Sequence, residues 1–163
     1  MEPHYYQVNV NWSKERMGIM CSPELNTSTE NKCIEVATPP QFPKGIPGIW
    51  SPEHLFTASV SSCFMTTFLS IAENSRLNFA SFSCLSKGKL EHVDGRPQMT
   101  EIHIMPTVVI GSESDREKTL RILNKAETAC LITNSIKSKV IMQPKIAVDP
   151  DAVKDKSAQV NAS

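Results

Sequence analysis

The sequence feature that most constrains the fold is a run from Leu55 to Ala72 that contains no charged residue. The residues just before this run have the pattern of a helix N-terminus. Ser51 can accept hydrogen bonds from free backbone N–H groups, Pro52 suits the first helical position, and Glu53 complements the positive end of the helix dipole. We therefore predict a helix that ends near residues 74–76. Because none of its faces is charged, we expect it to be buried nearly all round.

A membrane span is the main alternative for this run, since about 18 uncharged residues can cross a bilayer. The run carries seven hydroxyl residues, however, no basic residue closely flanks its N-terminal side, and no second span follows it. These features favour a buried helix of a soluble protein that has no contact with a membrane.

Charge and cysteine content narrow the class of protein further. The 163 residues include 17 Lys and Arg residues and 17 Asp and Glu residues, so nothing indicates nucleic acid or an anionic surface as a partner. Residues 1–4 lack the basic and apolar pattern of a signal peptide. Five cysteines without CxxC spacing are typical of mostly free thiols in a reducing compartment. We therefore expect a cytoplasmic protein.

The residues before the long helix predict three short strands. Apolar and polar residues alternate from Tyr6 to Trp12, which is typical of a half-buried strand. A turn leads to a second strand at about residues 19–21, and a third follows at 32–38. Four prolines and two glycines within 39–48 then predict an extended loop without helix, which leads into the long helix.

The residues after the helix predict a hairpin, a second helix and a last strand. The segments 79–92 and 99–110 flank an Asp-Gly pair, a good hairpin signal, and Pro106 indicates a bulge or an edge. Ser114 and Glu117 have the spacing of a capping box, so we expect a helix to open there and to reach residues 137–139. The last strand is predicted at 140–148.

The order of these elements is three strands, helix, hairpin, helix and strand. This order is typical of an α+β protein and not of an alternating α/β protein. Neither a repeat nor a linker interrupts it, so we expect one domain over residues 1–148. From 149 to 163 the chain is polar, and we expect a disordered tail there.

Two interpretations are open for Cys63 and Cys130, which both lie inside predicted, mostly apolar helices. A buried cysteine often packs as a small hydrophobic residue. A functional cysteine needs a thiolate, whose pKa a nearby cation would lower below about 8.5. Arg16, in a tight turn beside Gly18, is the candidate cation, although an arginine in a turn is usually a solvated charge. Packing is the simpler interpretation for the three cysteines on predicted strands, Cys21, Cys33 and Cys84.

Four segments together resemble the OsmC and Ohr proteins, which are thiol peroxidases that act on hydroperoxides. They are Ser51–Phe56, the Ser-Cys-Phe of residues 62–64, the Ala-Cys of residues 129–130 and the Arg-Met-Gly of residues 16–18. The resemblance covers about residues 5–148. Leu131 stands where many members have proline, and Trp50-Ser51 replaces the commoner Thr-Asn. These departures leave the cysteine pair intact and leave the subgroup and the preferred peroxide open.

The resemblance implies an OsmC-like fold, with antiparallel sheets around two long central helices in an intertwined homodimer. It implies that Cys63 is the thiolate that attacks the hydroperoxide and becomes a sulfenic acid, and that Cys130 resolves this acid to a disulfide. An external thiol or dithiol would then reduce the disulfide. Arg16 would stabilise the thiolate and Glu53 would hold Arg16 through a charge-assisted pair. No metal and no bound organic cofactor would take part.

One geometric point bears on these roles. Glu53 and Cys63 are ten positions apart, which corresponds to about 15 Å of rise on one straight helix. One arginine cannot comfortably bridge that distance. Either the helix starts later or bends, or Arg16 and Glu53 serve the Cys63 of another subunit, and we favour the second option.

Two other functions fit the same residues. The chain could be a redox sensor or a stress-related binding protein, whose cysteine pair oxidises reversibly with little peroxidase turnover. It could also be a non-catalytic ligand-binding domain whose cysteines only pack. Glu101 and His103 share one face of a predicted strand and His92 lies on the facing strand, but a metal site there is disfavoured because no further ligand has suitable spacing.

Overall fold

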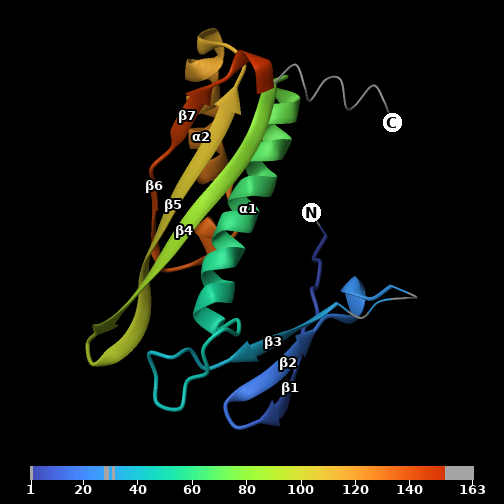
Figure 1. Ribbon diagram of the computed structural model, residues 1–163, viewed down its shortest axis with the longest axis vertical. Helices are drawn as coiled ribbons and strands as arrows, with labels where there is room; N and C mark the ends of the chain where they lie inside the picture. The colour runs from blue at the N-terminus through green and yellow to red at the C-terminus, as the bar shows by residue number, and fades with distance from the viewer. Residues whose placement is uncertain (1, 28–29, 31, 153–163) are drawn as a thin grey trace. The chain divides into compact units, whose positions relative to one another are not determined.

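The computed structural model describes residues 2–27, 30 and 32–152 (Figure 1). The chain divides into two compact units, Met1–Phe56 and Thr57–Ser163. The first unit holds a three-stranded sheet, and the second holds a four-stranded sheet with two helices. The chain therefore has the predicted α+β fold class. The prediction of one domain over residues 1–148 stays a prediction.

The first unit is built on sheet A, which consists of β1 (Asn9–Lys14), β2 (Met17–Cys21) and β3 (Cys33–Ala37). The strands are antiparallel in the order β1-β2-β3. A short 3-10 helix, η1 (Pro23–Leu25), follows β2. The three strands were predicted in this order, but β1 starts later than expected and is exposed throughout. Apolar and polar residues of β1 point to opposite faces of sheet A, so that one face of this sheet is apolar.

A disulfide joins Cys21, the last residue of β2, to Cys33, the first residue of β3. The prediction that these two cysteines are packed free thiols is wrong. The antiparallel register places them directly opposite each other, with 4.4 Å between their Cα atoms. Opposed residues at this separation are close enough to be bridged. The other three cysteines, Cys63, Cys84 and Cys130, are free thiols.

The long helix α1 (Pro52–Asn74) has the predicted bounds, and its N-terminus carries a reciprocal cap. The Ser51 hydroxyl accepts a hydrogen bond from the His54 N–H at 3.3 Å, and His54 Nδ1 accepts one from the Ser51 N–H at 3.4 Å. This arrangement is a capping box in which an imidazole replaces the usual Glu or Gln side chain. The serine cap was predicted and the role of His54 was not.

Burial of α1 is confined to one face. Its fully buried residues follow a spacing of four along the helix and are Val60, Phe64, Phe68 and Ala72. Burial nearly all round was therefore a wrong prediction for a single chain, because sheet B covers only this face. By length and composition α1 could cross a membrane, although core helices of soluble proteins pass the same test. Only 22% of its apolar window is buried.

Sheet B forms the second unit around a long hairpin, β4 (Phe79–Val93) and β5 (Arg96–Ile110). Asp94 and Gly95 form the tight turn with φ of 51° and 74°, as an Asp-Gly pair favours. The predicted last strand is in fact two short strands, β6 (Lys139–Met142) and β7 (Lys145–Val148), which both pair with β5 in parallel. Gln143 and Pro144 separate these two strands.

Pro106 is buried in the centre of sheet B, opposite Cys84, and neither at an edge nor at a bulge. It lies at the point where the partner of β5 changes from β6 to β7. The parallel pairing to β6 ends at Ile104, and the pairing to β7 begins at Thr107. Proline is tolerated in this central strand because its missing N–H falls between the two parallel ladders.

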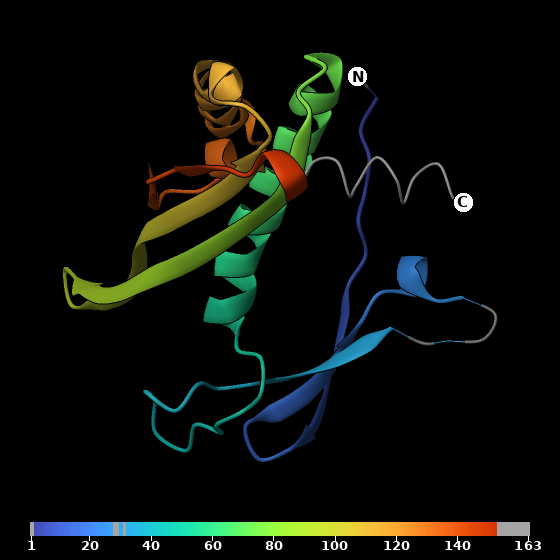
Figure 2. The ribbon, with the colours of Figure 1, turned by 45° about the horizontal axis from the view of Figure 1, so that its top comes forward.

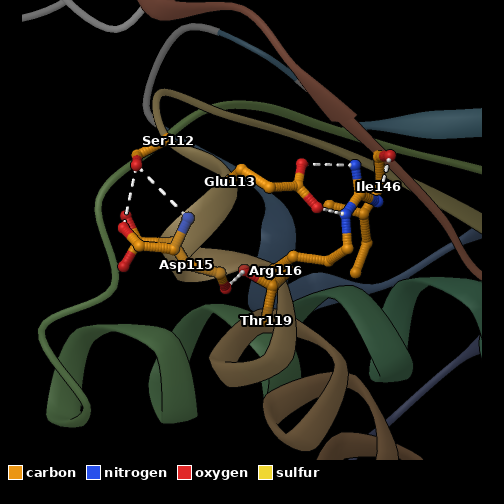
Figure 3. Close-up of polar contacts among 7 residues, drawn as sticks. Ser112, Glu113, Asp115, Arg116, Thr119 and Ile146 are labelled. Atoms are coloured by element: carbon orange, nitrogen blue, oxygen red, sulfur yellow. Dashed lines mark hydrogen bonds and ion pairs between the residues drawn. The ribbon is translucent and has the colours of Figure 1, made fainter.

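The second helix, α2 (Arg116–Ala129), is shorter than predicted at both ends. The predicted capping box is not formed. Instead a 3-10 turn, η2 (Glu113–Asp115), precedes the helix, with Ser112 as its cap (Figure 3). Arg116 binds the Glu113 carboxylate and donates to the Ile146 carbonyl on β7 at 2.9 Å. After Ala129 the chain turns into η3 (Thr133–Ser135) and does not continue as helix to 137–139.

The core of the second unit lies between sheet B and the two helices, which cover the same face of the sheet (Figure 2). Alternate residues of β5 are fully buried on this face, among them Ile102, Ile104 and Val108. On α1, Phe68 stacks on Phe82 of β4 with 4.8 Å between the ring centroids. This packing fixes how α1 and the end of α2 meet, and the cysteine pair lies where they meet.

The first residues of the predicted tail are hydrogen-bonded. The Asp149 N–H donates to the Ile110 carbonyl at 2.8 Å, and the Asp149 carboxylate accepts from the N–H groups of Asp151 and Ala152. Residues 153–163, the rest of the predicted tail, lie outside the described part of the chain.

Candidate active site

The two cysteines singled out from the sequence meet in the second unit. Cys63 lies in the middle of α1, one residue from the buried Phe64, and is half-buried. Cys130 is fully buried and caps the C-terminus of α2. It was predicted inside a helix, and its true position at the helix end matters because the chain that follows turns back toward Cys63. The two thiols are hydrogen-bonded to each other.

The surroundings of Cys63 favour its thiolate. Partial burial raises the pKa of this thiol, but four hydrogen bonds together outweigh burial and hold the pKa below its ordinary value. The donors are the backbone N–H of Ile132, the Cys130 thiol, the Thr67 hydroxyl and the backbone N–H of Leu131. These donors converge on a single sulfur atom.

The surroundings of Cys130 favour its protonated thiol. Burial raises the pKa of Cys130, and the hydroxyl and the backbone N–H of Thr133 only partly offset this effect. The neighbouring Cys63 raises the pKa further, because two thiolates repel each other. Of the two thiols, Cys63 therefore ionises first as the pH rises, and its thiolate accepts a hydrogen bond from the Cys130 S–H.

This arrangement has a specific chemical capacity. The thiolate is the nucleophilic form of cysteine, so Cys63 is the more reactive of the two. A protonated thiol within hydrogen-bond distance can form a disulfide with Cys63 once that sulfur has been oxidised. Cys84, the third free thiol, lacks such a partner set, and burial raises its pKa. The pair, and not Cys84, is the redox candidate.

Arg16 and Glu53 belong to the other unit. Arg16 lies exposed in the turn between β1 and β2, and its carbonyl accepts a hydrogen bond from Thr38 at 3.1 Å. It lines a cavity of about 470 Å³ together with Glu15, Lys44, Gly45 and Ile46. Glu53 is half-buried in the first turn of α1. Because α1 begins at Pro52, the option in which the helix starts after Glu53 is excluded.

Several groups of the site are not among the residues predicted from the sequence. Thr67 lies one turn after Cys63 on α1, so the spacing of four residues could have indicated it. The N–H groups of Leu131 and Ile132 have no side-chain signature and depend on the turn after α2.

An open hollow of about 450 Å³, lined mostly by apolar surface, lies between α1 and α2 and reaches the residue before Cys130. Its lining residues are Ile71, Asn124, Lys125, Thr128 and Ala129.

Comparisons with known proteins identify the family of the chain. The model of the family described as "OsmC-like protein" matches residues 45–145. The uncharacterised protein YmaD of Bacillus subtilis is 24% identical over 151 residues, which are 91% of this chain and 97% of YmaD.

Two solved structures are similar in fold. An OsmC-like protein of unknown function from Vibrio cholerae has a TM-score of 0.76 and 22% identity, and the match covers 87% of this chain and 99% of that one. An organic hydroperoxide resistance protein from Legionella pneumophila has a TM-score of 0.68 and 17% identity, with 91% and 100% covered.

Proposed function

The chain belongs to the OsmC-like family, and on this premise we propose that it is a cysteine-based peroxidase that reduces organic hydroperoxides to alcohols. The observation that carries the proposal is the hydrogen-bonded pair of Cys63 and Cys130, whose pKa values are displaced in opposite directions. Two cysteines that only pack have no need for pKa values that differ in this way. A thiol peroxidase needs one thiol that ionises readily and attacks the peroxide, and a second thiol that resolves the sulfenic acid.

In the first step the Cys63 thiolate attacks the distal oxygen of the hydroperoxide. The O–O bond breaks, an S–O bond forms, and the alkoxide leaves with a proton as the alcohol. Cys63 becomes a sulfenic acid. The hydrogen bonds from Ile132, Thr67 and Leu131 favour the anionic form of the sulfur before this step.

In the second step the Cys130 sulfur attacks the sulfur of the sulfenic acid. The S–O bond breaks, water leaves, and a disulfide joins Cys63 to Cys130. An external thiol or dithiol then reduces this disulfide by exchange and is itself oxidised. The reductant supplies the two electrons that the hydroperoxide has taken up, so the cycle balances.

Arg16 and Glu53 complete the proposed site. Arg16 would stabilise the Cys63 thiolate and orient the peroxide, and Glu53 would hold the guanidinium in place. We propose that both act on the Cys63 of a second subunit in a homodimer. The uncovered apolar faces of α1 and sheet A support such a dimer, because exposed apolar patches of this kind are typical of interfaces. The hollow beside Cys130 suits the organic part of a hydroperoxide.

Peroxide turnover tests the proposal. The wild-type chain should consume cumene hydroperoxide continuously when dithiothreitol is present, and Cys63→Ser should abolish this turnover. In the absence of dithiothreitol, Cys130→Ser should allow a single oxidation of Cys63, which then stalls as a sulfenic or over-oxidised acid. Cys84→Ser is the matched control and should keep the wild-type rate. Stoichiometric oxidation without turnover in the wild type would instead favour a redox sensor.

A further inference from the structure

We propose that the Cys21–Cys33 disulfide is a second thiol–disulfide exchange site, which small thiols open by attack on the Cys33 sulfur. This site lies in the other unit from Cys63 and Cys130 and goes beyond the proposed peroxidase function, on which it does not depend. Three features of sheet A support it: the face that carries the disulfide, the strand that carries Cys33, and the place of the bridge in the ladder.

The disulfide lies on the polar face of sheet A. Directly opposed residues of an antiparallel sheet point to the same side, so the register assigns each residue to a face. Val10, Met20 and Ile34 are in register on one face, which is apolar. The disulfide lies on the other face, where the neighbouring side chains are all exposed: Asn9, Asn11, Ile19 and Glu35. A partner that covers the apolar face would leave the disulfide open to solvent.

The two sulfur atoms are not equally accessible. Cys21 is half-buried on β2, the central strand, between Asn9 of β1 and Cys33 of β3. Cys33 is exposed on β3, which is the end strand in the order of sheet A. A thiolate must approach along the extension of the S–S bond, and access decides which sulfur is attacked. Approach to Cys33 comes from the open side of β3, whereas approach to Cys21 would have to cross β1.

The exchange is balanced in atoms and electrons. The thiolate of a small thiol bonds to the Cys33 sulfur, the S–S bond breaks, and Cys21 leaves as a thiolate that takes up a proton. With a monothiol the product is a mixed disulfide on Cys33. With a dithiol the second thiol displaces Cys33, so that the reagent is oxidised by two electrons and both cysteines become thiols.

Opening the bridge would release one end of sheet A. Cys21 and Cys33 form the last pair of the β2–β3 ladder, and their 4.4 Å Cα separation is that of a pair without mutual backbone hydrogen bonds. In the described part of the chain the ladder ends at the cysteine pair, so beyond Met20 and Ile34 the disulfide is the link between the two strands at this end. Amide hydrogen exchange of this pair should therefore rise on reduction.

The test uses the folded wild-type chain and cysteamine, without peroxide. A cationic thiol is chosen because Glu35 lies two residues from Cys33 on the same face and would repel an anionic one. After brief treatment, acid quench and alkylation, peptide mapping should find cysteamine on Cys33 and the alkyl label on Cys21. Cysteamine on Cys21 would overturn the assignment. A bridge that opens only when guanidinium unfolds the chain would overturn the proposal.

Two single variants provide matched controls. Cys21→Ser leaves the Cys33 thiol, and Cys33→Ser leaves the Cys21 thiol. The first should react with cystamine about tenfold faster than the second, because access governs exchange. Equal rates would contradict the proposal even if one variant were less stable. None of these readouts involves Cys63 or Cys130, so failure of the peroxidase function would leave them unchanged.

Discussion

At Cys63 burial and hydrogen bonding act in opposite directions, and hydrogen bonding prevails. Burial raises the pKa of the thiol, whereas donors from Ile132, Cys130, Thr67 and Leu131 lower it by a larger total. Two of these donors are backbone N–H groups, which do not titrate and which every substitution except proline retains. These hydrogen bonds therefore stabilise the anion relative to an ordinary cysteine, whatever Arg16 adds to the effect.

The reactivity of the two thiols should separate with pH. Because the pKa of Cys63 lies below its ordinary value and that of Cys130 above it, Cys63 should be half-ionised at a lower pH than an ordinary cysteine and Cys130 at a higher pH. Alkylation rates by iodoacetamide, followed for each cysteine by peptide mapping between pH 5 and pH 10, measure both midpoints. Coincident midpoints, or the reverse order, would refute the assigned roles.

Leu131 offers a test of the backbone donors. Leu131→Pro removes one N–H from the Cys63 sulfur and should raise the pKa of Cys63 and slow its alkylation near neutral pH. The residue before the substitution accepts a following proline, since Cys130 has φ −64° and ψ 113°. Leu131→Ala keeps the N–H and is the control, because the leucine side chain is 70% exposed. Equal effects of the two variants would contradict this role.

Among the elements, α1 has two roles. Its buried face packs in the core, and the same helix carries Cys63. Phe68→Ala should lower the free energy of unfolding by about 3–5 kcal/mol, since the ring is fully buried and stacked on Phe82. Chemical denaturation measures the change. Ser70→Ala, an exposed position on the same helix, should alter stability by less than about 0.5 kcal/mol. If the two substitutions lowered the free energy of unfolding by similar amounts, Phe68 would not be a core residue.

Local patterns predicted most elements, and the errors arose where tertiary pairing decides. The bounds of α1 follow from its cap and its uncharged run, and the hairpin follows from Asp94 and Gly95, whose positive φ values that turn requires. The end of α2 at Ala129 could not be predicted, because apolar spacing continued beyond it. The Cys21–Cys33 bridge depends on the register of two strands, which no local motif specifies.

The same limit applies to the candidate site. Cys63 and Cys130 were found through the family resemblance, since a buried cysteine alone has no functional signature. Thr67 and the N–H groups after α2 appear only when the chain is folded. The roles of Arg16 and Glu53 stay predictions, because these residues lie in the other unit.

For the whole molecule, the uncovered apolar surface is the feature to explain. Trp12 on sheet A is 78% exposed, and Leu69 on α1 is 40% exposed. A second copy of the chain would cover such surface and complete the all-round burial that the composition of α1 predicts. Size-exclusion chromatography with light scattering should therefore give about twice the 18.1 kDa chain mass.

A charge on the uncovered face of α1 should break this assembly. Leu69→Asp should shift the mass toward that of one chain, because an aspartate would be buried without a partner. Leu120→Asp on α2 is the control, since Leu120 has nearly the same exposure, 41%. A wild-type chain that stays monomeric at micromolar concentration would contradict the dimer.

The central claim is that Cys63 and Cys130 are a peroxide-reactive pair, and one measurement tests it most directly. The reduced protein receives one equivalent of cumene hydroperoxide, and intact mass spectrometry is followed by peptide mapping. We predict a loss of two hydrogens, located to a Cys63–Cys130 disulfide and distinguished by its peptides from the Cys21–Cys33 bridge. If both thiols stay free and alkylate slowly, the cysteines only pack, and the family fold carries no peroxidase activity in this chain.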